Sequence, residues 1–178
     1  VDPDKSITHR CYIIAAQCVG ISKINGLVSE DVEATINALK KLGIKIIKKK
    51  DASYVYGRGI SGFNKFIGIL DFKNSGTSAR SFLGILTCFP HSVIITGDAS
   101  LKLRPFKRLT GYLESIGATI IHPKNKSFNL PIKITGTKNW ALAQKHYVKV
   151  KSAQITSSLI YAAIQTKGIT EIIESSET

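Results

Sequence analysis

The chain has 178 residues, 43% of them hydrophobic and 21% charged, which is enough apolar material for one domain with a core of its own. No apolar run reaches the roughly 18 residues that a membrane-spanning helix needs, and the chain does not open with the basic and then apolar segments of a secretory signal. The formal net charge of +13 raises the possibility of a nucleic-acid partner.

The basic residues do not form an obvious nucleic-acid groove. Only five of the 25 are arginines, and Tyr54 and Tyr56 are the only aromatic residues near the densest cluster. We interpret that cluster as a solvated face and keep nucleic-acid binding as the alternative. The cluster consists of Lys40, Lys41, Lys45 and Lys48–Lys50.

Three cysteines occur without the paired spacing of a metal site or a disulfide framework. Cys11 and Cys18 are seven residues apart, on one face of a predicted helix, and we expect both to be buried as small apolar residues. This cysteine pattern predicts a reduced, cytoplasmic protein.

The first predicted elements are helix, strand, helix and strand. The first helix begins near Ser6, carries an apolar stripe and stops at Gly20, before a strand at 21–25. A second stripe spans 32–42, is closed by Gly43, and leads into a strand at 44–47. The first helix's stripe consists of Ile7, Cys11, Ile14, Ala15 and Cys18.

The same order recurs further along the chain. A helix follows residues 74–80 and stops at Pro90, a strand follows at 93–96, and a helix over 106–116 lies between Pro105 and Gly117, before a strand at 119–121. A third helix begins near Ser152, stops at Gly168 and precedes a strand at 169–173. We therefore predict repeat units at about 1–70 and 71–148 and an incomplete third unit at 149–178.

The helix beginnings are the predicted sites of chemistry. Ser, Thr and Gly at a helix N-terminus allow a phosphate or carboxylate to approach unpaired backbone amides, and an arginine there can hold the anion with two hydrogen bonds. Arg10, Arg80 and Arg104 each lie near such a beginning. The alternative is ordinary capping with surface arginines. The glycine-rich stretch 57–62 lacks a strand leading into a helix and is interpreted as a loop, and the four histidines have no metal-binding spacing.

Five motifs in order resemble those of the 5-enolpyruvylshikimate-3-phosphate (EPSP) synthase family. They are DKSITHR at 4–10, NSGTSAR at 74–80, GDASLKLRP at 97–105, LPIKITG at 130–136 and SAQ at 152–154. The resemblance implies an α/β enolpyruvyl transferase-like domain of repeated β-α-β-α units, an inside-out α/β barrel, here incomplete. The sister family that acts on UDP-N-acetylglucosamine typically has Lys-Asn where this chain has Lys5-Ser6, and is a distant second.

The resemblance implies transfer of the enolpyruvyl group of phosphoenolpyruvate to the 5-hydroxyl of shikimate 3-phosphate, with release of phosphate, in aromatic amino acid biosynthesis. It implies no metal or organic cofactor, no nucleic-acid or membrane partner, and a monomeric complete enzyme. The family's acid and base carboxylates are expected beyond Thr178, so we expect no turnover from this chain alone. A decayed fragment or a basic binding module is the remaining alternative.

Individual roles are carried over by motif. Lys5 is expected to contact both substrates and to act in catalysis. The residues expected to bind shikimate 3-phosphate are Lys5, Ser6, Arg10, Ser152, Ala153 and Gln154. Those expected to bind phosphoenolpyruvate are Lys5, Gly76, Arg104 and Gln154. Those expected to shape the supporting loop are Asn74, Thr77 and Arg80. The family usually has Gly where this chain has Pro3, so we expect an altered connection into the first motif.

Overall fold

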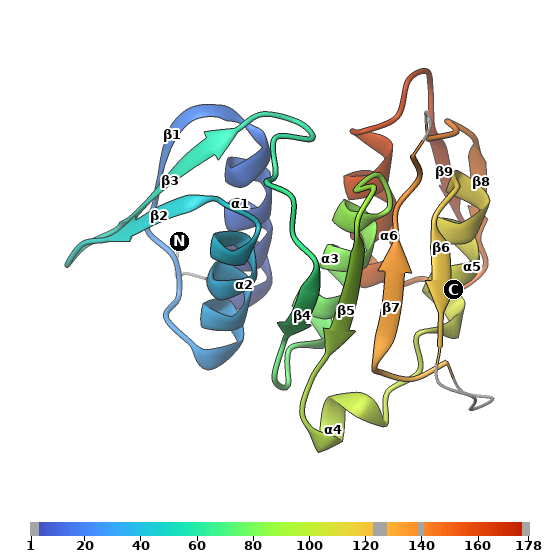
Figure 1. Cartoon of the computed structure of the whole chain (residues 1–178), viewed down its shortest axis with the longest axis horizontal. Helices are drawn as coiled ribbons and strands as arrows, with labels where there is room; N and C mark the ends of the chain where they lie inside the picture. Colours follow the sequence, from blue (N-terminus) through green and yellow to red (C-terminus); the bar gives the residue numbers. More distant parts are fainter. Residues whose placement is uncertain (1–3, 123–127, 139–140, 176–178) are drawn as a thin grey trace.

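The computed structural model describes residues 4–122, 128–138 and 141–175, so Pro3 lies outside the described residues. Helices and strands are interspersed along the chain (Figure 1). The helices are α1 (Lys5–Gln17), α2 (Glu30–Lys41), α3 (Gly76–Leu86), α4 (Ala99–Lys102), α5 (Lys107–Ile116) and α6 (Ala153–Ala163). The strands are β1 (Val19–Ile24), β2 (Lys45–Lys48), β3 (Ser53–Arg58), β4 (Gly68–Asp71), β5 (Ser92–Thr96), β6 (Thr119–Ile121), β7 (Ile132–Thr135), β8 (Lys145–Val148) and β9 (Glu171–Glu174).

The strands form three sheets in the described part of the chain. The first is antiparallel with the order β1-β3-β2, the second is mixed with the order β4-β5-β7-β6, and β8 pairs with β9 in parallel. Strands β5, β7 and β6 of the second sheet follow the same order as β1, β3 and β2 of the first. The parallel β4-α3-β5 unit likewise recurs as β8-α6-β9. This internal similarity supports the proposed repeat, whose unit boundaries stay a prediction.

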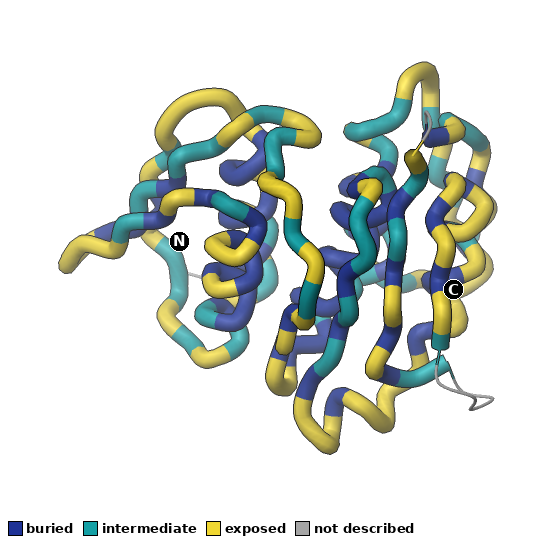
Figure 2. The backbone as a smooth tube through the Cα atoms, in the orientation of Figure 1, coloured by how far each residue is buried: buried dark blue, intermediate teal, exposed yellow. Residues whose placement is uncertain are grey.

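Helices α3 and α6 lie behind the four-stranded sheet, while α1 and α2 lie beside the first sheet (Figure 1). One hydrophobic cluster connects these elements and includes Ile13 of α1, Leu39 of α2, Phe82 of α3 and Leu159 of α6. The close approach of α3 to α6 depends on Gly84, because a Cβ atom there would lie 2.1 Å from the backbone oxygen of Ser158. The backbone coloured by burial shows this interior in dark blue (Figure 2).

Two predicted helix stripes are confirmed. In α2 the stripe residues are all 2% exposed or less, and those of α5 are all 1% exposed or less. Gly43 and Gly117 end these helices with φ values of +88° and +123°, which side chains rarely adopt. The buried stripe residues are Val32, Ile36 and Leu39 of α2 with its C-cap Leu42, and Leu109, Leu113 and Ile116 of α5 with its N-cap Phe106.

The predicted buried stripe of α1 is wrong at four of its five residues, and only Ala15 is buried. Cys11 and Cys18 are exposed, and Ile7 and Ile14 are 57% and 50% exposed. The helix instead buries a neighbouring face toward α2 and β3, on which Tyr12 is 4% exposed. Apolar residues occupy both faces of α1, so periodicity alone could not decide which one the core covers.

Other predictions from the sequence have mixed outcomes. The stretch 57–62 is a turn only in its second half, because Gly57 and Arg58 complete β3. The lysine cluster is exposed, and Lys45 and Lys49 lie over the rings of Tyr56 and Tyr54 at 4.8 and 4.9 Å from the centroids.

Among the described residues, no helix is long and apolar enough to cross a membrane, and no group of three or more His, Cys, Asp or Glu side chains could hold a metal ion.

Candidate functional site

Three helices of the core begin with the polar residues that the motifs identified. The Asp4 side chain caps α1 by accepting a hydrogen bond from the backbone N–H of Ile7, and the Ser75 hydroxyl caps α3 in the same way. Ser152 precedes α6, but its hydroxyl makes no capping hydrogen bond. Ala153 follows as the exposed first residue of α6. The Ser152 hydroxyl and the backbone amides of Ala153 and Gln154 are therefore available to an anion, whereas the Ile155 amide donates to the Ser152 carbonyl.

Side-chain hydrogen bonds connect these beginnings across long sequence separations. The Arg10 guanidinium on α1 donates from Nε to the Ser157 hydroxyl on α6 at 3.2 Å, and from Nη1 to the Ser6 carbonyl at 3.0 Å. The Gln154 amide on α6 donates to the Thr77 hydroxyl on α3 at 3.1 Å. The structure thus brings the beginnings of α1, α3 and α6 to one region.

Two guanidinium groups converge on Gly76, the first residue of α3. A Cβ atom at Gly76 would lie 2.8 Å from Arg80 Nη1 and 3.2 Å from Arg104 Nη1. Arg80 donates to the carbonyl oxygens of Gly76 and Pro105, at 3.3 and 3.1 Å. Arg104 donates to the Asn74 side-chain oxygen at 2.9 Å. The absence of a side chain at Gly76 therefore allows two cationic groups to lie directly against the start of α3.

No described arginine has a carboxylate partner within ion-pair distance; all four recorded ion pairs in the described part involve lysines. Burial, and then the neighbouring Arg104 charge, lower the pKa of the Arg80 guanidinium. The Arg80 group still keeps its charge, because a guanidinium does not lose its proton in proteins. Two cations that repel each other without a carboxylate between them favour binding of an external anion.

Lys5 lies at the start of α1 and faces α2. Its ammonium group donates to the Asp31 carboxylate at 2.8 Å, and the Lys5 side chain stays half exposed. The sequence analysis missed Asp31, which is 26 residues away and matches none of the quoted motifs. This pair holds the ammonium near the helix beginning and leaves it open to a ligand.

A small hollow of about 160 Å³ is lined by several of the predicted site residues and by one residue that the sequence analysis did not propose. Arg80, Ser152 and Gln154 line it together with Arg108. The available signal for Arg108 was its position, four residues after Arg104 and next to the start of a predicted helix. Arg108 adds a third guanidinium to this side of the molecule.

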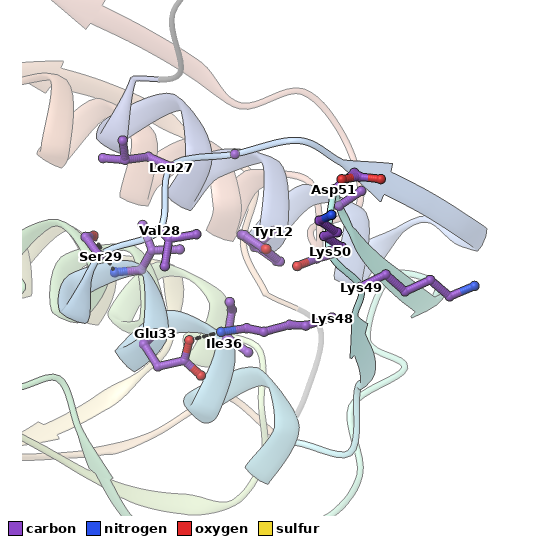
Figure 3. Close-up of a pocket in the computed structure, with 14 residues that line it drawn as sticks. Tyr12, Leu27, Val28, Ser29, Glu33, Ile36, Lys48, Lys49, Lys50 and Asp51 are labelled. Carbon is purple, nitrogen blue, oxygen red and sulfur yellow. Dashed lines mark hydrogen bonds and ion pairs between the residues drawn. The ribbon is translucent and has the colours of Figure 1, made fainter.

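Two other hollows have different linings. One of about 470 Å³ is lined by Asn74, Lys73 and several carboxylates, including Asp31 and Asp98, so the positive side of the candidate site ends at Asn74. Another of about 190 Å³ lies beside the start of α2, where Lys48 is paired with Glu33 and Tyr12 lies among the lining residues (Figure 3). It contains none of the predicted site residues.

All of residues 1–178 match the family model described as EPSP synthase (3-phosphoshikimate 1-carboxyvinyltransferase). The chain belongs to the EPSP synthase family. Two EPSP synthase relatives, named 3-phosphoshikimate 1-carboxyvinyltransferase, come from Alkaliphilus oremlandii and a Sulfurihydrogenibium species. They are 42% and 38% identical to this chain over 176 and 175 residues, and the match covers 98% of this chain.

The EPSP synthase of Acinetobacter baumannii has the same architecture. Its solved structure matches with a TM-score of 0.92 and 30% identity, covering all of this chain and 40% of that structure. This match confirms the predicted α/β enolpyruvyl transferase fold, of which the chain holds a part. The chain likewise spans about 40% of the length of the two curated relatives.

Proposed function

We propose that this chain supplies one side of the active site of an enolpyruvyl transferase of the shikimate pathway. In the proposed reaction, the 5-hydroxyl oxygen of shikimate 3-phosphate bonds to C2 of phosphoenolpyruvate. The bond from C2 to the phosphate oxygen breaks, and the hydroxyl proton leaves with the phosphate. The convergence of Arg80 and Arg104 on Gly76, with no carboxylate of the described residues within ion-pair distance of either, carries this proposal, because both substrates are anions.

Shikimate 3-phosphate is proposed to bind where α1 and α6 begin. Ser152 and the amide of Ala153 offer donors at the start of α6, and Gln154 is held near α3 by its bond to Thr77. Ser6 and Arg10 approach from α1. The Arg10 guanidinium already reaches Ser157 on α6, so it can exchange its hydrogen bonds to protein oxygens for hydrogen bonds to the phosphate oxygens.

Phosphoenolpyruvate is proposed to bind over Gly76, beside Arg104 and Gln154. Lys5 lies at the α1 beginning, and its ammonium is proposed to contact both substrates and to offset negative charge that develops in the transition state. Asn74, Thr77 and Arg80 are proposed to shape this loop. Asn74 does so by bridging Arg104 and Asp98, with hydrogen bonds of 2.9 Å on each side.

The 178-residue chain is proposed to bind shikimate 3-phosphate without turning it over. Proton transfer requires an acid or base within hydrogen-bond reach of the reacting atoms, and the residues assigned above are mainly amides, hydroxyls and permanent cations. The whole enzyme is proposed to act as a cytoplasmic monomer without cofactor. The three cysteines, all free thiols, support a reducing compartment.

Calorimetric titration of the 178-residue chain with shikimate 3-phosphate tests the substrate assignment, with shikimate as the matched control that lacks the phosphate. We expect heat of binding from the phosphorylated compound and at least tenfold weaker binding of shikimate. Equal affinity for the two compounds would refute the assignment, and so would tighter binding of an oligonucleotide that weakens steeply with salt.

Activity needs a longer protein. We expect a chimera of this chain with the remaining residues of the Alkaliphilus oremlandii relative to release phosphate from the two substrates, and the 178-residue chain to release none. The unmodified relative is the control for the assay. Phosphate release by the chain alone would contradict the proposed division of the site.

A further inference from the structure

Four polar side chains from α1, α2 and α3 meet in the interior, below the candidate site. They are His9, Thr35, Ser75 and Ser78, each 2% exposed or less. The Thr35 hydroxyl lies 2.8 Å from His9 Nδ1 and 2.6 Å from the Ser78 hydroxyl. Ser78 in turn lies 3.2 Å from His9 Nδ1 and 2.7 Å from the Ser75 hydroxyl. We call these four residues the hydroxyl–imidazole cluster.

The cluster lies one helical turn below the Lys5–Asp31 ion pair. His9 follows Lys5 by four residues on α1, and Thr35 follows Asp31 by four residues on α2, so each pair shares a helix face. The Lys5–Asp31 ion pair and the His9–Thr35 hydrogen bond, both 2.8 Å long, therefore connect α1 to α2 at two successive levels. The upper level is partly exposed and the lower one is buried.

The same cluster also reaches the start of α3. Ser75 caps α3 by accepting from the backbone N–H of Ser78, and it immediately precedes Gly76. Its hydroxyl also bonds to that of Ser78, which contacts both α1 and α2 through His9 and Thr35. The beginnings that carry Lys5 and Gly76 are thus joined through hydroxyl and imidazole groups as well as through apolar packing.

Hydrogen bonds restrict the cluster more than apolar contacts would. Buried hydroxyls must keep their partners, and the directions of their bonds fix how the three helices are placed, whereas apolar side chains tolerate sliding. Burial lowers the pKa of the His9 imidazole and so favours the neutral ring, in which Nδ1 acts either as a donor or as an acceptor in the cluster. Its Nε2 atom is buried and has no hydrogen-bond partner among the described residues.

We propose that the hydroxyl–imidazole cluster is a positioning device that sets the location of Lys5 and of the Gly76 turn relative to each other. This inference rests on the proposed function, because these two residues are assigned there to the substrates. None of the four cluster side chains needs to touch a substrate. Their effect passes through the helix beginnings that they hold together.

Paired substitutions at one position separate hydrogen bonding from packing. Thr35→Val keeps the volume and removes the hydroxyl, whereas Thr35→Ser keeps the hydroxyl and removes a methyl group. Ser78→Ala is an independent variant that removes the central hydroxyl. Thr87→Val is the matched control, because Thr87 is fully buried at the opposite end of α3 and donates a single hydrogen bond to the Leu83 carbonyl.

The first measurement uses the ligand-free 178-residue chain. The NMR signals of the Gly76 amide and of 13C-dimethylated Lys5 report the two positions directly. We expect Thr35→Val and Ser78→Ala to shift both signals, Thr35→Ser to restore them to near the parent positions, and Thr87→Val to move neither. If both signals stay unchanged in folded Thr35→Val and Ser78→Ala, the positioning role is wrong, whatever ligand the chain binds.

The second measurement is the affinity for shikimate 3-phosphate by calorimetry. We expect Thr35→Val and Ser78→Ala to weaken binding at least fivefold, and Thr35→Ser and Thr87→Val to change it less than twofold. A fivefold loss in Thr87→Val as well would reduce the cluster to a general stability effect and overturn the inference. If the signals of Gly76 and Lys5 shift as expected but the parent chain binds no shikimate 3-phosphate, the proposed function fails while the positioning role stands.

Discussion

Gly76→Ala gives the most direct test of the space between the two guanidinium groups. The new Cβ atom would lie 2.8 Å from Arg80 Nη1 and 3.2 Å from Arg104 Nη1, closer than the 3.4–4 Å of ordinary van der Waals contact. Both guanidiniums must therefore move by several tenths of an ångström. They are the flexible ends of long side chains, so the protein accommodates the methyl group at the expense of the ligand site.

Gly76→Ala is expected to weaken the binding of phosphoenolpyruvate without lowering the stability of the protein. Gly76 begins a helix and is not among the glycines with positive φ, so alanine should leave the unfolding free energy unchanged or raise it by up to about 1 kcal/mol. Loss of one charge-assisted hydrogen bond to phosphoenolpyruvate should cost about 1.5–3 kcal/mol. That loss corresponds to a roughly 10- to 150-fold increase in KM for phosphoenolpyruvate.

The assay is steady-state phosphate release by the chimera with the Alkaliphilus oremlandii relative, with each substrate varied in turn. We expect the KM for phosphoenolpyruvate to rise far more than the KM for shikimate 3-phosphate. Gly111→Ala in α5 is the matched control, because a Cβ atom there meets nothing within 4 Å. Equal increases in both KM values, or the same increase in the control, would refute the reasoning.

Three further predictions concern other parts of the structure. Arg10→Lys should lose about as much affinity for shikimate 3-phosphate in calorimetry as Arg10→Ala, because an ammonium group cannot form the two parallel hydrogen bonds of a guanidinium. An affinity of Arg10→Lys equal to that of the parent chain would contradict bidentate binding by Arg10. Gly84→Ala should lower the unfolding free energy by about 1–3 kcal/mol in urea titrations, because the new Cβ atom would clash with the Ser158 backbone. An unchanged urea midpoint of unfolding would show that α3 and α6 can move apart without loss of stability. Burial lowers the pKa of His9 below its ordinary 6.5, so protonation of His9 favours the unfolded state, and the unfolding free energy should fall as pH drops below about 6.5. His9→Asn should reduce this dependence of the unfolding free energy on pH. An unaltered dependence in the variant would exclude His9 as its source.

Local patterns predicted much of the fold. The stripes of α2 and α5 are buried as expected, and the glycines that end these helices adopt the positive φ that closes them. These features depend on residues within a few positions of one another, so a single sequence contains them. Strands β3, β4, β7 and β8 were not predicted, because short strands with mixed exposure show little periodicity.

The order of the motifs and the helix beginnings could be recognised from the sequence alone, and these gave the family and a list of candidate residues. Only the tertiary structure decided which face of α1 is buried, that Arg10 reaches Ser157 across 147 positions, and that Asp31 is the partner of Lys5. Such contacts arise where helices that are separated in the sequence pack together. Helical periodicity fixes which residues share a face, but the packing of the whole chain decides what that face meets.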